Sequence, residues 1–359
     1  MGEVAEFING KAYKQEELLN EGKYKVVRVG NFNTNEHWYY SNLELENNKY
    51  MVAGDLLYLW ATDFGPKFWA GEKAIFHYHI WKLELNYKII DKNYLYVWLE
   101  TDKEKIKQST NGTTMVHVTK STMEKRVLSF PTLPEQQKIG TLFRRLDRLI
   151  TLHKRKWDDV ILLKKALLQK MFPKNGSDFP EIRFPEFTDA WEKCKLGEVA
   201  KRVKGNDGDM SLPTLTISAG SGWLDQKDRF SGNIAGSEQK NYTLLKRGQL
   251  SYNHGNSKLA KYGAVFVLRT YEKALVPRVY HSFTMLNNAD ADFIEFLFAT
   301  KIPDKELVKK ITSGARTDGL LNISFEGFMD IAITIPTLPE QQKIGNLFKQ
   351  LDRLITLHK

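Results

Sequence analysis

The chain has 359 residues, 42% of them hydrophobic, and its 53 Lys and Arg against 43 Asp and Glu give a formal net charge of +10. This length allows two or three domains with packed cores, and the basic balance favours an anionic partner, nucleic acid more readily than a membrane. The single cysteine, Cys194, excludes a disulfide framework, and the lack of a long apolar run or a signal-peptide pattern predicts a cytoplasmic protein.

Residues 1–130 mix short alternating segments with turn residues, which predicts a first α+β domain. In chain order the pattern predicts a strand at 23–29, a loop at 30–35, a turn entering a buried strand at 50–60, a loop at 61–67, a strand at 74–83 and a helix at 93–107. We therefore expect a mixed β-sheet with helices in this domain.

Residues 131–172 predict one long spacer helix. Pro134 suits the first helical turn, where a missing N–H costs nothing, and no further proline occurs before Pro173. About 39 residues at ~1.5 Å each make a rod of roughly 58 Å, too long to bury its apolar side chains against itself. The apolar residues follow a seven-residue step on two neighbouring lines, which is typical of a coiled coil. These residues are Ile139, Leu146, Val160 and Leu167 on one line, and Leu142, Leu149 and Leu163 on the other.

An alternative interpretation is a core helix of an ordinary globular domain, but such helices are usually much shorter. The sequence of the first part of this helix is repeated at the end of the chain. Residues 131–154 and 336–359 are identical at 21 of 24 positions, at a fixed offset of 205. We therefore expect the second copy, a shorter spacer helix at 336–359, to pair with the first. Its side of the coiled coil would be formed by Ile344, Leu347, Leu351 and Leu354.

Between the two copies lie a linker at 173–187, rich in proline, glycine and polar residues, and a second domain at 188–335. This domain repeats the first in outline. Leu196–Ala200 corresponds to Met1–Ala5, and Lys246–Tyr252 corresponds to Val52–Tyr58. Because the helices are near-copies while the domains share only a skeleton, we expect one common mechanical role and two different binding surfaces.

The duplicated Leu-Pro-Glu-Gln-Gln helix entry, the helix exit Leu168–Lys174 and the segment Glu181–Phe187 leading to Trp191 form a specific combination. With these features the chain resembles the specificity subunit of type I restriction-modification systems. The resemblance implies two target-recognition domains separated by antiparallel helices in a pseudo-two-fold internal repeat, each domain reading half of a bipartite target in double-stranded DNA. It also implies partners: two modification (methyltransferase) subunits and, in the complete enzyme, restriction subunits.

The chain departs from the pattern of that family at two places. The first domain has no counterpart of residues 181–195, and the second helix has no counterpart of residues 155–172. Residues 157–172 therefore have no full-length helical partner in the sequence.

Candidate DNA contacts follow from side-chain chemistry, because Lys and Arg suit phosphates while amide and hydroxyl groups suit base edges. A separation of roughly 58 Å sets an upper limit of about 17 base pairs between the centres of two half-sites. For any one of these residues, a surface position without base contact is about as plausible. The candidates in the first domain are Trp60, Thr62, Asp63, Lys67, Asn111 and Thr113, and those in the second are Lys240, Asn253, His254, Asn256, Ser257, Lys258, Arg316 and Thr317.

Motifs of catalysis are missing from the sequence. It contains no Walker loop, no methyltransferase motif and no Gly-x-Ser-x-Gly elbow, since Ser218–Gly222 lacks the required first glycine. His77 and His79 share one face of the predicted strand at 74–83, but no third metal ligand is near them. We therefore expect a non-catalytic subunit that binds no metal and no cofactor of its own.

The alternative from another class is a coiled-coil assembly protein whose globular domains bind proteins instead of DNA. A steeply salt-dependent DNA affinity would separate the two hypotheses, because only phosphate neutralisation releases condensed counterions.

Overall fold

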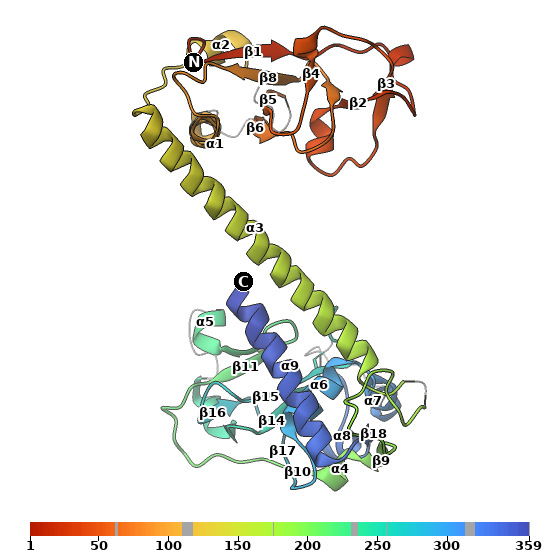
Figure 1. The fold of residues 1–359 in the computed structure, drawn as a ribbon. Coiled ribbons are helices and arrows are strands. Elements are labelled where there is room, and N and C mark those ends of the chain that lie inside the picture. Colours follow the sequence, from red (N-terminus) through yellow and green to blue (C-terminus); the bar gives the residue numbers. More distant parts are fainter. Residues whose placement is uncertain are drawn as a thin grey trace. The chain divides into compact units, whose positions relative to one another are not determined.

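The computed structural model describes residues 1–61, 64–109, 118–174, 176–230, 236–255, 257–312 and 320–358. The chain divides into two compact units, Met1–Leu152 and His153–Lys359, each considered by itself below (Figure 1). Within the described residues, no helix is long and apolar enough to cross a membrane.

The described residues of unit 1 form two four-stranded sheets. The first is antiparallel with the order β1-β8-β5-β6, and its strands are β1 (Ala5–Asn9), β8 (Ile80–Leu85), β5 (Leu56–Leu59) and β6 (Gly65–Phe68). The second has the order β3-β2-β7-β4, and its strands are β3 (Tyr39–Ser41), β2 (Tyr24–Val27), β7 (Ala74–Phe76) and β4 (Tyr50–Met51). In this second sheet β2 pairs in parallel with β7.

The helices of unit 1 cover the first sheet. α1 (Lys92–Ser109) lies beside β6, and its Leu95 and Leu99 are fully buried against Phe7 and Tyr58 of the sheet. The remaining elements are α2 (Lys120–Glu124), the start of α3 (Leu133–Lys170), and the 3-10 turns η1 (Gln15–Glu17), η2 (Val29–Phe32) and η3 (Asn47–Lys49).

Unit 2 is built on the same plan. Its central antiparallel sheet has the order β10-β17-β14-β15, with strands β10 (Ala200–Arg202), β17 (His281–Met285), β14 (Leu250–Asn253) and β15 (Ala264–Val267). Three strand pairs surround it: β11 (Leu215–Ser218) with β12 (Gly222–Asp225), β13 (Thr243–Lys246) with β16 (Lys273–Val276), and β9 (Glu192–Lys195) with β18 (Ala332–Ile335). Its helices are α4 (Leu196–Val199), α5 (Gln226–Phe230), η4 (Gly236–Asn241), α6 (Ala291–Ala299), α7 (Asp304–Lys310), α8 (Phe325–Met329) and α9 (Leu338–His358).

The strand registers show that the two central sheets are equivalent. Tyr58 of β5 pairs with Trp81 of β8, and Tyr252 of β14 pairs with His281 of β17. The outline repeat predicted from the sequence is therefore a repeat of sheet topology, and the α+β class is confirmed.

The duplicated helix entry makes the same contacts in both units. In unit 1 the buried side chain of Gln136 accepts a hydrogen bond from the Asp91 backbone N–H (2.9 Å) and donates to the carbonyls of Ile89 (3.1 Å) and Pro131 (2.8 Å). In unit 2 Gln341 does the same. It accepts from the Asp290 N–H (2.9 Å) and donates to the carbonyls of Asn288 (3.3 Å) and Pro336 (2.8 Å).

A close helix approach accompanies each glutamine. A Cβ on Gly140 would lie 2.7 Å from the Tyr94 backbone nitrogen, and a Cβ on Gly345 would lie 3.1 Å from that of Phe293. The near-identical repeat therefore forms the same helix–helix joint in both units: the start of α3 crosses the start of α1, and the start of α9 crosses the start of α6.

Within unit 2, the C-terminal half of α3 runs antiparallel to α9 (Figure 1). His153 Nδ1 lies 3.2 Å from His358 Nδ1, Lys164 pairs with Asp352, and the ring centroids of Phe172 and Phe348 are 6.0 Å apart. The predicted coiled-coil residues are buried to different extents. Ile344 and Leu351 are buried and Val160, Leu167 and Leu347 pack against them, whereas Leu163 and Leu354 are exposed. In unit 1, Ile139 is half-buried and Leu142, Leu146 and Leu149 are exposed.

Two predictions of local structure were wrong. The predicted strand at 74–83 is two strands, β7 and β8, which belong to different sheets and are separated by a turn at 77–79. The chain turns after His77, which bridges to Lys11, and it enters the other sheet at Ile80. The predicted loop at 61–67 is shorter, since β6 begins at Gly65, where a φ of 136° suits only glycine.

Candidate nucleic-acid interface

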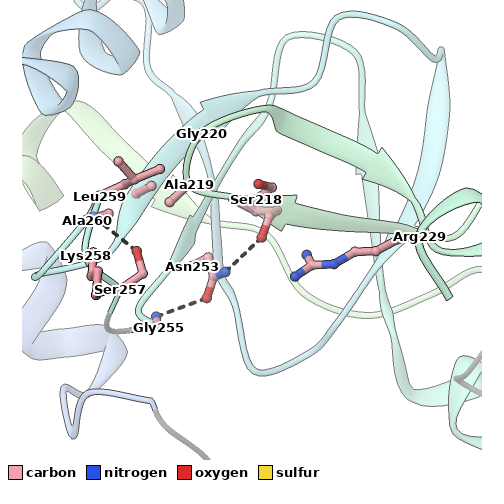
Figure 2. A pocket seen from close by; sticks show the side chains of 12 residues that line it. Ser218, Ala219, Gly220, Arg229, Asn253, Gly255, Ser257, Lys258, Leu259 and Ala260 are labelled. Atoms are coloured by element: carbon pink, nitrogen blue, oxygen red, sulfur yellow. Dashed lines mark hydrogen bonds between the residues drawn. The ribbon is translucent and has the colours of Figure 1, made fainter. Parts of the chain in front are cut away.

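A polar pocket of about 460 Å³ opens in unit 2 where β11 and β14 end (Figure 2). Its walls come from the β11–β12 turn at Ser218, Ala219 and Gly220, from Arg229 of α5, and from the loop that leaves β14. The loop contributes Asn253, Gly255 and the residues from Ser257 to Ala260. The strongest sequence candidates of the second domain therefore line one concave surface.

Asn253 organises this loop. Its Nδ2 donates to the Ile217 carbonyl at 3.2 Å, and its Oδ1 accepts from the Gly255 N–H at 3.1 Å. The amide thus ties β14 to β11 and starts the turn that presents Ser257 and Lys258. Ser257 Oγ in turn accepts from the Ala260 N–H at 3.1 Å, which closes the loop.

The pocket combines cationic and hydroxyl groups. In Figure 2 the Arg229 side chain extends toward the side of the pocket formed by Ser218 and Asn253. Lys258 and Ser257 on the loop are exposed. Guanidinium, ammonium and hydroxyl groups around one hollow can bind a phosphate or the acceptor edge of a base.

His254 lies beneath this loop. Its Nδ1 is 2.8 Å from the Leu321 carbonyl oxygen and its Nε2 is 2.8 Å from the Val279 carbonyl oxygen, so neither ring nitrogen faces the surface. The ring stacks on His281 with centroids 4.7 Å apart. Burial, reinforced by the neighbouring His254, lowers the pKa of His281 to about 4. In this arrangement His254 holds two backbone segments together.

Unit 1 has a different pair of rings at the equivalent place. Trp60 follows β5 as His254 follows β14, and it stacks on Trp81 with centroids 5.9 Å apart. Its Nε1 donates to the Tyr78 carbonyl at 2.7 Å, so it also ties down the turn before β8. Around it lie the exposed Tyr78 and the half-buried His79, whose ring centroids are 4.0 Å apart. Burial and the nearby His79 and Arg28 lower the pKa of His77 in this turn to about 4.

The other candidates are more scattered. Lys67 is half-buried on β6, and Lys240 is exposed on η4. Sequence reasoning missed Ser218, Arg229 and Tyr78, because turn residues gain their importance only from what lies beside them. Seven candidates lie outside the described residues: Thr62, Asp63, Asn111, Thr113, Asn256, Arg316 and Thr317.

In the described part of the chain, no group of three or more His, Cys, Asp and Glu is arranged to hold a metal ion. His77 and His79 have ring centroids 4.8 Å apart, without a third such ligand among those residues.

The chain matches the family described as the type I restriction modification DNA specificity domain over residues 1–162 and 188–359. It is 24% identical over 336 residues to the type I restriction enzyme MjaVIII specificity subunit of Methanocaldococcus jannaschii, which covers 88% of this chain and 77% of that protein. It is also 27% identical over 157 residues to the EcoBI specificity subunit of Escherichia coli, covering 41% of this chain and 32% of that protein.

A solved structure has the same fold. The S subunit of a type I restriction-modification system from M. genitalium matches with a TM-score of 0.58 at 14% identity, covering 99% of this chain and 89% of that one.

Proposed function

Because the chain belongs to the type I restriction-modification DNA specificity family, we propose that each of its two units reads one half of a bipartite target in double-stranded DNA. The chain is the DNA sequence-recognition subunit of such a system. The observation that carries the proposal is that the two units share one sheet topology and differ in the side chains at the rim of the sheet, where β5 and β14 end. Trp60 and Trp81 in unit 1 stand where His254 and His281 stand in unit 2.

In unit 2 the contact surface is the pocket between the β11–β12 turn and the loop after β14. Arg229 and Lys258 bind phosphate or guanine acceptors, and Ser218 and Ser257 complete the contact. Asn253 and His254 act as positioning residues, because their polar groups are engaged by the loop itself. In unit 1 the corresponding surface includes Tyr78 and the ring cluster around Trp60.

The proposal assigns chemistry to partner chains. The subunit supplies no catalytic residue and binds two modification subunits and, in the complete enzyme, restriction subunits. Catalysis by the partners is consistent with the sequence, which contains no Walker loop and no methyltransferase motif.

The experiment that tests this function is to express the chain with a cognate modification subunit and map methylated adenines in the host DNA. A split motif with an unspecified gap is the expected result. A complex that forms and methylates no defined sequence would contradict the proposal and favour an assembly protein.

A second test addresses the pocket. Replacing Lys258 or Arg229 with Ala should weaken specific DNA binding by the complex on the order of tenfold, and should reduce the slope of log affinity against log salt by about 1. Lys305→Ala, an exposed lysine on α7 that does not line the pocket, is the matched control. Equal salt slopes for all three variants would remove this pocket from the interface.

A further inference from the structure

The end of β2 in unit 1 lies against the turn between β7 and β8. The His77 N–H donates to the Val27 carbonyl at 2.9 Å, and the Trp60 N–H donates to the His79 carbonyl at 3.2 Å. β2 ends at Val27, so the next residue, Arg28, stands at the same rim as Trp60.

The other unit supports this placement, because β11 is the counterpart of β2. β2 pairs antiparallel with β3 and parallel with β7. β11 pairs antiparallel with β12, and Thr214 beside it bridges in parallel to Leu275 of β16. β7 and β16 each precede, by a short turn, a strand of the central sheet. Ser218 at the end of β11 lines the pocket of unit 2, so the end of β2 is the corresponding place in unit 1.

The side chain of Arg28 is half-buried and packs on an aromatic ring. Its Cζ lies 4.2 Å from the ring centroid of Tyr39 on β3, within the range of a cation–π contact. His37 packs edge-on against the same Tyr39 ring, with centroids 4.7 Å apart. Among the described residues, the buried Nε of Arg28 has no hydrogen-bond partner and no carboxylate pairs with the guanidinium.

A cation that loses part of its hydration without gaining an anion destabilises the folded chain, and a ring contact offsets this only in part. The free N–H donors of Arg28 therefore predict a ligand that supplies acceptors. A guanidinium is planar and has five donors and no acceptor, and packing on Tyr39 fixes its plane. It matches a group with two acceptors in one plane, such as O6 and N7 of guanine in the major groove.

We propose that Arg28 reads a guanine in the half-site of unit 1, with two guanidinium N–H groups donating to its O6 and N7. This inference rests on the proposed function and deepens it by naming a residue and the base that it reads. Adenine is disfavoured, because its N6 amino group would face a second donor. Tyr39 is a positioning residue, since its ring orients the guanidinium.

The test uses the complex of the full chain with its modification subunits, bound to the target that methylation mapping identifies. Each guanine of the target is replaced in turn by 7-deazaguanine, which lacks the N7 acceptor. At one guanine in one half-site, the replacement should weaken binding of the parent complex about tenfold. Arg28→Lys keeps the charge and loses the planar fork, so it should bind the unmodified target about tenfold more weakly. At that one guanine, the variant should show no further loss from 7-deazaguanine.

Three further variants make the result specific. Arg148→Lys makes the same exchange at an exposed arginine of α3 and should keep the parent's losses at every guanine. Tyr39→Leu should reduce the loss at the guanine that Arg28 reads, and Tyr39→Phe, which keeps the ring, should retain it.

The inference is overturned if Arg28→Lys keeps the parent's loss at every guanine, or if the half-site of unit 1 contains no guanine. It is also overturned if Arg28→Ala weakens binding to the target and to unrelated DNA equally, because that result identifies a phosphate contact. These results leave the proposed function standing. A parent complex that prefers no DNA sequence would instead refute the proposed function itself.

Discussion

At the scale of single residues, the positions that follow β5 and β14 combine a constant role with a variable side chain. Trp60 places its Nε1 2.7 Å from the carbonyl oxygen of Tyr78, in the turn before β8. His254 places its Nε2 2.8 Å from the carbonyl oxygen of Val279, in the turn before β17. An indole and an imidazole differ in size and polarity, yet both place a ring nitrogen within hydrogen-bond distance of a carbonyl in the equivalent turn. The loops around them are therefore held in equivalent places while presenting different chemistry.

The stacked histidines of unit 2 make its stability sensitive to acid. The pKa of His281 is about 4 in the folded protein against an ordinary value of 6.5, so between these values the unfolded chain binds more protons. The free energy of unfolding of unit 2 should thus have its maximum contribution from His281 above pH 6.5. It should fall by on the order of 2 to 3 kcal/mol as the pH drops toward 4.

Urea unfolding of the parent chain and of His281→Phe at pH 7 and pH 5 measures this effect. The ring lies among Tyr252, Phe325 and Phe328, and its Nε2 lies 3.0 Å from the Ile323 carbonyl oxygen. The variant loses that contact at both pH values, and it should lose less stability between pH 7 and pH 5 than the parent. The titratable and charged neighbours, His254, Arg202 and Glu326, remain in both proteins. His37→Phe, at an exposed site, should keep the parent's pH dependence, and an unchanged dependence in His281→Phe would refute the assignment.

At the scale of elements, the helix entry shows why two adjacent glutamines are not equivalent. Gln341 is fully buried and makes three hydrogen bonds to backbone groups, whereas Gln342 is exposed. On a helix, neighbouring residues point about 100° apart, so only one of the pair can face α6. The same holds for Gln136 and Gln137 in unit 1.

Gln341→Ala should destabilise unit 2 by about 1–3 kcal/mol, because it leaves the Asp290 N–H and two carbonyls without partners in a buried joint. Gln342→Ala should change stability by less than about 0.5 kcal/mol, since it is exposed and alanine favours helix. Equilibrium urea unfolding followed by circular dichroism compares the two. Similar losses in both variants would show that the buried bonds contribute nothing particular.

At the scale of the whole molecule, the two units repeat one sheet topology within one chain and differ at the rims of their sheets. If each rim reads one half-site, a change on one unit should relax recognition of one half-site only. Tyr78→Ala alters the rim of unit 1, and Lys258→Ala alters the rim of unit 2.

Methylation of DNA libraries randomised in either half of the target, by complexes carrying each variant, measures this separation. We expect each variant to accept new bases in a different half. The two variants serve as controls for each other, and relaxation of both halves by either one would contradict independent reading.

The sequence by itself determined the repeat, the two spacer helices and the α+β class. A 24-residue near-copy leaves no doubt about a shared structural element, and long seven-residue periodicity specifies a helix over many turns. In the structure α3 spans Leu133–Lys170, and the sequence pattern predicts a spacer helix at 131–172. The strand at 74–83 failed because a run of strand-forming residues does not indicate where the chain leaves one sheet and enters another.

Only the tertiary structure decided which identical residues are covered and which loop residues meet. Phe143 and Phe348 have nearly the same local sequence, and in unit 2 part of residues 157–191 covers Phe348. Ser218 and Arg229 join Asn253 and Lys258 because the β11–β12 turn and α5 lie beside the end of β14. Such neighbours are brought together by long-range packing, which leaves no periodic trace in the local sequence.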